Sequence, residues 1–180
     1  LEPRFGSPGD LKALSEGLAS RDIALYLDVV TNHVAYDSPL VTEHPDWFHG
    51  LGDIEDWQDR AQVLDHDVHG LPDLNQAHPE VQEWLGAAGE HWIETARVQG
   101  FRLDAVRHVP QEFWRSYTER MRRAGGEDFV LLGEMFDGDP AVVAAAQRDG
   151  GFSGMFDFPL YYALVDVFCR EADPGRLASV

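Results

Sequence analysis

The sequence predicts an α/β fold in which crossover helices cover a parallel β-sheet. Its 180 residues, 44% hydrophobic and 26% charged, suffice for one domain with a substantial core. Short apolar segments of strand length alternate with longer segments of helical periodicity. Because parallel strands need crossover connections, this alternation indicates consecutive βα units.

The first third of the chain predicts one helix, one strand and a long loop. Residues 8–20 carry three leucines at helical spacing. Residues 23–30, Ile-Ala-Leu-Tyr-Leu-Asp-Val-Val, form a nearly continuous apolar run, as expected of a buried parallel strand. Residues 31–77 follow and are rich in His, Asp, Gly and Pro. A loop of this length in a compact chain usually has a function.

The rest of the chain predicts four more helices and three more strands. The helices are residues 78–99, 110–123, 140–148 and 160–171, and the strands are residues 100–106, 129–134 and 152–158. Four strands cannot close an eight-stranded (β/α)8 barrel, which typically needs about 250 residues. The sheet is therefore either open by design or part of a larger barrel.

The charge and the apolar runs exclude several classes of partner. A net charge of -18 argues against nucleic acid and anionic membranes as partners, because both are polyanions. No apolar run approaches the ~18 residues that span a bilayer. The single cysteine, Cys169, excludes an internal disulfide, and its apolar surroundings predict a packing role.

Polar side chains gather where the predicted strands end. In parallel α/β folds, sites form at the carboxyl ends of the strands. Asp28, Asn32 and His33 close the first strand. Arg102 and Asp104 lie in the second, and Arg107 and His108 follow it. Glu134 ends the third strand, and Asp157 lies near the end of the fourth. We expect these side chains to share one edge of the sheet.

Two of these carboxylates suit a pair of opposite chemical roles. Strand alternation puts Arg102 and Asp104 on one face, where the guanidinium can hold Asp104 ionised as a nucleophile requires. Glu134 follows an apolar run, and such surroundings favour a protonated general acid. One ionised and one protonated carboxyl group is the arrangement for glycosidic cleavage. Taken singly, each carboxylate is better explained as a member of a structural salt bridge at a strand end.

Four segments, in this order, together resemble the alpha-amylase family of glycoside hydrolases, family 13. They are Asp-Val-Val-Thr-Asn-His (28–33), Leu-Pro-Asp-Leu-Asn (71–75), Gly-Phe-Arg-Leu-Asp-Ala-Val-Arg-His (100–108) and Gly-Glu (133–134). The resemblance extends over essentially the whole chain. It implies part of a (β/α)8 barrel, about strands 3 to 6, formed by residues 1–33 and 76–180. Residues 34–75, here called the insert, would form a small inserted domain after the first strand present.

The resemblance assigns the catalytic roles by position. It implies that Asp104 is the nucleophile that forms a β-glycosyl ester. Glu134 would protonate the leaving oxygen and then activate water, and Arg102 would position Asp104.

The same resemblance assigns residues that bind substrate and metal. His33 would hydrogen-bond the sugar at the cleavage point, and Arg107 and His108 would lie on the leaving-group side. Asn32, Asp73 and the main-chain carbonyl of His108 match positions that bind a structural calcium in many members, and oxygen ligands suit that hard cation.

One catalytic group of the family is missing from the sequence. The family uses a third carboxylate, an aspartate in an Asn-His-Asp motif after the seventh strand. The only asparagines here are Asn32 and Asn75, and neither begins that motif. The expectation is therefore a fragment of the catalytic barrel that is inactive, or nearly so, when alone.

The insert contains aromatic and histidine side chains that admit two interpretations. Trp47, Phe48 and Trp57 could stack on sugar rings, but a small core of the insert is the better-supported expectation. His66 and His69 form an isolated His-x-x-His, which is weak evidence for zinc. A capping or hydrogen-bonding role is favoured for them.

The predicted function is retaining hydrolysis of α-1,4-glucosidic bonds in starch-like glucans or maltooligosaccharides. A transglycosylase or an α-glucosidase of the same family shares this chemistry. A non-catalytic relative that binds glucan or protein is less favoured, because Asp104 and Glu134 are both present. A metal-dependent hydrolase built on the histidines is the least favoured alternative.

Overall fold

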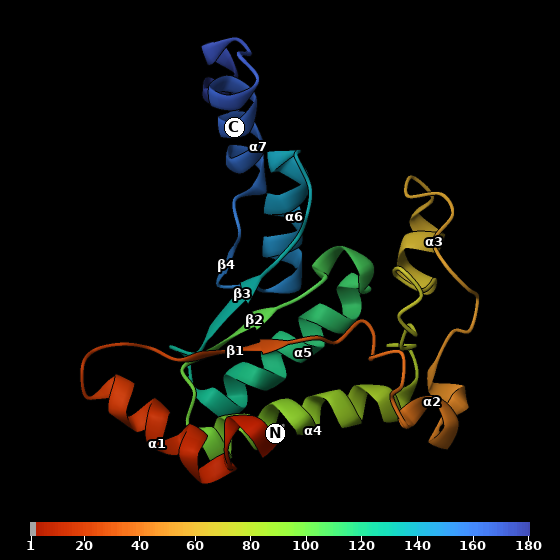
Figure 1. Cartoon of the computed structure of the whole chain (residues 1–180), viewed down its shortest axis with the longest axis vertical. Helices are drawn as coiled ribbons and strands as arrows, with labels where there is room; N and C mark the ends of the chain where they lie inside the picture. Colours follow the sequence, from red (N-terminus) through yellow and green to blue (C-terminus); the bar gives the residue numbers. More distant parts are fainter. Residues whose placement is uncertain (1–2) are drawn as a thin grey trace.

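A computed structural model describes residues 3–180 and contains a four-stranded parallel sheet (Figure 1). The strands lie in chain order and are β1 (Tyr26–Val29), β2 (Gly100–Leu103), β3 (Val130–Gly133) and β4 (Gly154–Met155). Each pairs in parallel with the next. The predicted parallel α/β sheet is confirmed.

The five predicted helices are all present. They are α1 (Pro8–Ala19), α4 (Pro79–Ala96), α5 (Gln111–Gly125), α6 (Pro140–Gly150) and α7 (Phe158–Cys169). Side chains at their amino ends fix where several begin; Ser7 and Asp10 form a capping box at α1, for example. None of the helices described is long and apolar enough to cross a bilayer.

The segment predicted as a long loop contains short helices. They are α2 (Leu40–Glu43), the 3-10 helix η2 (Pro45–Trp47) and α3 (Arg60–Asp65). Three further 3-10 helices lie elsewhere: η1 (Pro3–Phe5), η3 (Val106–His108) and η4 (Pro174–Ala178). Antiparallel bridges join His33 to Asp73 and Phe48 to Leu74, so the end of the insert lies beside the segment that follows β1.

The strands are shorter than the sequence predicted. The predicted strand 23–30 is a strand only over β1. The predicted strand 100–106 stops at Leu103, because Ala105 adopts a left-handed conformation (φ 54°) and η3 follows. The predicted strand 152–158 is reduced to β4, because the Asp157 side chain caps α7, which begins at Phe158.

The core lies between the sheet and helices α4 and α5. Its fully buried members include Val81 of α4, Phe101 and Leu103 of β2, and Trp114 and Met121 of α5. Gly89 lets α4 approach α5 closely. A Cβ at this glycine would lie 2.5 Å from Met121 Sδ and 2.8 Å from Tyr117 Oη.

Apolar surface is exposed near both edges of the sheet. Tyr26 and Val30 are exposed at the β1 edge. Beyond β4, helix α7 projects away from the sheet and exposes several large apolar side chains (Figure 1). The prediction that Cys169 packs in a core is wrong, because Cys169 ends this projecting helix and is exposed.

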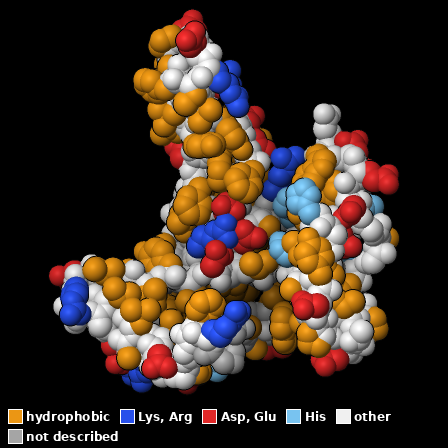
Figure 2. Space-filling view, in the orientation of Figure 1, with side chains coloured by type: hydrophobic (Ala, Val, Ile, Leu, Met, Phe, Trp, Pro, Cys, Tyr) orange, Lys and Arg blue, Asp and Glu red, His pale blue; other side chains and the backbone are white. Residues whose placement is uncertain are grey.

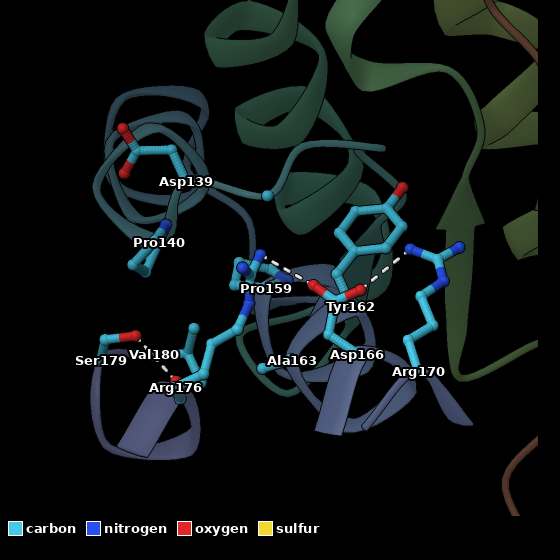
Figure 3. A pocket seen from close by; sticks show the side chains of 11 residues that line it. Asp139, Pro140, Pro159, Tyr162, Ala163, Asp166, Arg170, Arg176, Ser179 and Val180 are labelled. Atoms are coloured by element: carbon cyan, nitrogen blue, oxygen red, sulfur yellow. Dashed lines mark hydrogen bonds and ion pairs between the residues drawn. The ribbon is translucent and has the colours of Figure 1, made fainter. Parts of the chain in front are cut away.

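A cavity of about 630 Å3 lies between the start of α6, helix α7 and η4 (Figure 3). Asp166 of α7 contacts Arg170 at 2.9 Å and Arg176 at 2.8 Å, which fastens η4 against α7. Both arginines already have Asp166 as an ion-pair partner, so these polar side chains have a structural role in holding η4 against α7.

The two helical glycines Gly89 and Gly17 should respond oppositely to alanine. Gly89→Ala should destabilise the chain by roughly 1–3 kcal/mol, because the methyl group overlaps Met121 and Tyr117. Gly17→Ala in α1 should stabilise it by about 0.5–1 kcal/mol, because the new methyl group would lie 4.0 Å from Arg21 Nη1 and would overlap no neighbouring side chain. Urea unfolding measures both values. Equal effects of the two changes would contradict the packing described.

Candidate active site

Arg102 connects carboxylates from three neighbouring strands. Its Nη1 lies 2.7 Å from Asp28 Oδ1 and 2.8 Å from Asp104 Oδ1, and its Nη2 lies 2.5 Å from Glu134 Oε2. The register supports this arrangement, since Asp28 of β1 lies opposite Arg102 of β2. Figure 2 shows acidic side chains gathered around basic ones in the hollow at the centre of this face.

The guanidinium of Arg102 remains charged in this cluster. Burial alone would lower its pKa, but hydrogen bonds to Glu134 and Asp28 and the charge of Asp104 raise the pKa above its ordinary value. The surroundings of Glu134 differ from the expectation. It follows the apolar strand β3, yet its carboxylate contacts a guanidinium rather than an apolar surface.

Main-chain hydrogen bonds hold both proposed catalytic carboxylates just beyond the strand ends. The Glu134 N–H donates to the Leu103 carbonyl at 2.8 Å, and the Val106 N–H donates to the Glu134 carbonyl at 2.9 Å. The Asp104 N–H donates to the carbonyl of Val29 at 3.0 Å. The main-chain hydrogen bonding of the sheet thus continues past the strand ends and restricts the positions of both carboxylate side chains.

Two histidines border the cluster. Burial lowers the pKa of His33, and the negative charge of Asp104 opposes this effect. Burial also lowers the pKa of His108, while its hydrogen bond to the Val63 carbonyl opposes the shift. His108 Nδ1 lies 3.0 Å from that carbonyl, so Nδ1 carries the proton and Nε2 is left free in the neutral ring.

The insert is fastened to η3 by three hydrogen bonds to main-chain carbonyls. His108 provides the first through Val63. Arg60 Nη1 of α3 donates to the Arg107 carbonyl at 2.7 Å, and Arg107 Nη2 donates to the Trp57 carbonyl at 3.2 Å. The predicted substrate-binding residues Arg107 and His108 are therefore oriented by the insert.

The residues predicted to bind calcium contain oxygen atoms without partners. Asn32 and Asp73 are fully buried, and neither Asn32 Oδ1 nor Asp73 Oδ1 has a hydrogen-bond partner. The other oxygen of Asp73 lies 2.7 Å from His49 Nδ1. Burial raises the pKa of Asp73 to about 6, and His49 opposes this shift. Two orphaned oxygens of this type fit a hard cation, which would restore partners to both.

Other predicted side chains have structural positions. Asp157 accepts a hydrogen bond from the Leu160 N–H at 2.9 Å and caps α7, apart from the Arg102 cluster. Trp47 is buried in the core, whereas Trp57 is 42% exposed. His66 Nδ1 lies 3.2 Å from the Asp53 carbonyl. The described residues contain no group of three or more His, Cys, Asp or Glu side chains that could hold a metal.

The sequence did not reveal the roles of two residues that position the site. Asp28 was noted at a strand end but not as a partner of Arg102, and the parallel register was the signal that could have identified it. Arg60 gave no local signal, because its partner carbonyl is 47 residues away.

Comparisons with known proteins connect this geometry to one family. Residues 41–179 match the model of the alpha amylase catalytic domain. The beta/alpha-amylase of Paenibacillus polymyxa is 31% identical over 98% of this chain, and alpha-amylase 2 of Schwanniomyces occidentalis is 30% identical over 93%. The chain spans 15% and 34% of the lengths of these two relatives.

A solved structure shows the same architecture. The alpha-amylase of Geobacillus thermoleovorans, crystallised with acarbose, superposes with a TM-score of 0.87 and 41% sequence identity. The match covers 91% of this chain and 37% of that protein. The four βα units are therefore part of a (β/α)8 barrel, as the sequence predicted.

Removing the central guanidinium should destabilise the site through charge repulsion. Arg102→Met should cost about 1–3 kcal/mol of unfolding free energy, because it leaves Asp104 and Glu134 uncompensated. The double variant Arg102→Met/Asp104→Asn should lose less than the sum of the single changes, with a coupling of about 0.5–3 kcal/mol. Denaturant unfolding measures the cycle. Arg97→Met removes a guanidinium from an exposed ion pair and is the control. If the losses from Arg102→Met and Asp104→Asn simply add in the double variant, the cluster described is contradicted.

Proposed function

Since the chain belongs to the alpha-amylase family of glycoside hydrolases, we propose that it acts on α-1,4-glucosidic bonds of starch-like glucans or maltooligosaccharides with retention of configuration. The observation that carries this proposal is the contact of Arg102 with both Asp104 and Glu134. Two carboxylates that share one guanidinium lie near each other. This fits the separation of about 5–5.5 Å used by retaining enzymes.

The proposed reaction proceeds in two displacements. Glu134 protonates the glycosidic oxygen while Asp104 attacks the anomeric carbon, so the carbon–oxygen bond to the leaving sugar breaks and an ester forms. Glu134, now ionised, takes a proton from water, and that water displaces Asp104 from the sugar. Arg102 keeps Asp104 oriented and stabilises its negative charge before the attack and after its release.

The neighbouring side chains supply binding contacts to the sugar. His33, which borders the Arg102 cluster and feels the charge of Asp104, is the proposed hydrogen-bonding partner of the sugar at the cleavage point. Arg107 and His108 are the proposed contacts on the leaving-group side. The free Nε2 of His108 can accept a hydrogen bond from a sugar hydroxyl.

A structural calcium is part of the proposal. Asn32, Asp73 and the main-chain carbonyl of His108 would hold it, and the orphaned oxygens of Asn32 and Asp73 support this choice. The ion would neutralise a buried carboxylate and link the strand ends to the insert. It would take no part in the displacement steps.

Turnover by the 180-residue chain alone should be slow. The sequence contains no Asn-His-Asp motif, and the sheet of residues 3–180 has two unpaired edges. The sugar would therefore lack the third carboxylate of the family, which is expected to bind its hydroxyl groups.

A chimera tests the chemistry. Residues 3–180 would replace the matching segment of the Geobacillus thermoleovorans alpha-amylase, which supplies the remaining barrel. On maltoheptaose, NMR should show α-anomeric products. Asp104→Asn or Glu134→Gln should lower the rate by at least about 100-fold, because each removes a reacting group.

Glu94→Gln, at an exposed position of α4, provides the isosteric control and should leave the rate unchanged. A folded chimera that releases β-anomers, or that keeps its rate in Glu134→Gln, would refute the proposal. Rapid turnover by the bare chain would refute the expectation that it is slow.

Calcium should stabilise the chain independently of activity. At a concentration 100 times its Kd, it should add about 2.7 kcal/mol to the unfolding free energy, and EGTA should remove that gain. Asp73→Asn should abolish the gain, whereas Asp46→Asn, at an exposed carboxylate, should retain it. Thermal unfolding provides the measurement. A gain that persists in Asp73→Asn would place the ion elsewhere.

A further inference from the structure

A buried glutamine fastens the segment that follows β1. Gln76 is 1% exposed, directly follows the insert and precedes helix α4. Its Nε2 donates to the main-chain carbonyl of Thr31 at 3.1 Å and to that of Asn32 at 3.4 Å. These bonds span 45 and 44 residues of sequence. They therefore join the chain that leaves β1 to the chain that enters α4.

Gln76 is itself held in place by its main chain. Its carbonyl accepts a hydrogen bond from Gln82 Nε2 of α4 at 2.8 Å. Two residues before it, the Leu74 N–H donates to the Asn32 carbonyl at 2.8 Å. The main chain of Gln76 is thus anchored to α4, while its side chain reaches back to the segment after β1. Among these contacts, the bond to Thr31 lies nearest to β1 along the chain.

The amide at this position is polar in a place where an apolar side chain would be the simpler choice. Within residues 3–180, neither Gln76 Oε1 nor Thr31 Oγ1 has a hydrogen-bond partner, although both are buried. A buried oxygen without a partner lowers stability, and an apolar side chain of the same shape avoids that loss. The amide therefore contributes geometry, because its two donors fix the positions of two carbonyls.

Asn32 connects these carbonyls to two parts of the proposed site. Its Oδ1 is the buried, unpartnered oxygen proposed to hold the ion, and its Nδ2 lies 3.2 Å from His33 Nδ1. Because an amide nitrogen only donates, His33 Nδ1 accepts, and the neutral ring carries its proton on Nε2. That proton is the one His33 can donate to a sugar oxygen. A displaced Asn32 would thus move an ion ligand and a sugar contact together.

We propose that Gln76 is a positioning residue of the site. Its amide fixes the main chain of Thr31 and Asn32, and so sets where Asn32 Oδ1 meets the ion and where His33 meets the sugar. The inference rests on the proposed function, which supplies both the ion and the sugar contact. Gln76 acts through Asn32 and is assigned no contact with either ligand. Groups that orient a metal ligand in this way typically change metal affinity by about 10–100-fold when they are removed.

Gln76→Met tests the inference, because methionine has a similar length but no N–H donor. Calorimetric titration of the 180-residue chain with calcium should give a Kd about tenfold higher, or more, in this variant. In NMR spectra, the ring C–H signals of His33, identified by their loss in His33→Gln, should shift between the unsubstituted chain and Gln76→Met.

Gln99→Met is the matched control. Gln99 also fastens β1 through its amide, since its Oε1 accepts a hydrogen bond from the Leu25 N–H at 2.7 Å. It does so at the amino end of β1, away from the strand end that carries the site. This variant should lower the unfolding temperature but leave the calcium Kd and the His33 signals unchanged.

The two readouts separate positioning from simple stabilisation. If Gln76→Met lowers only the unfolding temperature, so that the calcium Kd or the His33 signals stay unchanged, the inference is overturned. If the unsubstituted chain binds no calcium, the ion of the proposed function is refuted, and the His33 signals alone decide the inference. Gln76→Asn, whose amide is too short to reach both carbonyls, replaces Gln76→Met if that variant does not fold, and the same outcomes apply.

Discussion

The guanidinium of Arg102 is the interaction on which the site depends. Asp28, Asp104 and Glu134 come from three strands, and their negative charges would repel one another in the same hollow. One delocalised cation with several donors can satisfy all three at once, which an ammonium group does less well. The parallel register places this cation on the middle of those three strands. The register of the sheet and the balance of charge therefore favour the same arrangement, with one guanidinium between three carboxylates.

The second constraint is the attachment of the insert to η3. The bonds from Arg60, Arg107 and His108 all end on main-chain carbonyls, so they fix backbone positions rather than side-chain pairs alone. The buried pair Asn32 and Asp73 lies where the first strand's end meets the end of the insert. The insert is thus part of the architecture of the site.

Exposed surface distinguishes the two ends of the sheet from its centre. Helices α4 and α5 bury the central strands, whereas β1 and β4 have unpaired edges in the described chain. The apolar residues exposed along α7 and near β1 match the surface that neighbouring units cover in a closed (β/α)8 barrel. Of the residues at the Arg102 cluster, Arg102, Asp104 and Glu134 lie on or just beyond the central strands β2 and β3, whereas Asp28 lies on the edge strand β1.

The sequence by itself determined the alternation of helices and strands and the placement of Arg102, Asp104 and Glu134 at strand ends. Both follow from local periodicity, which a linear chain displays directly. Only the tertiary structure decided which groups these side chains contact. Asp28 reaches Arg102 across 74 residues, and Arg60 reaches Arg107 across 47. The surroundings of Glu134, the cap at Asp157 and the exposure of Cys169 were likewise set by which elements meet in space, and local pattern carries no information about that.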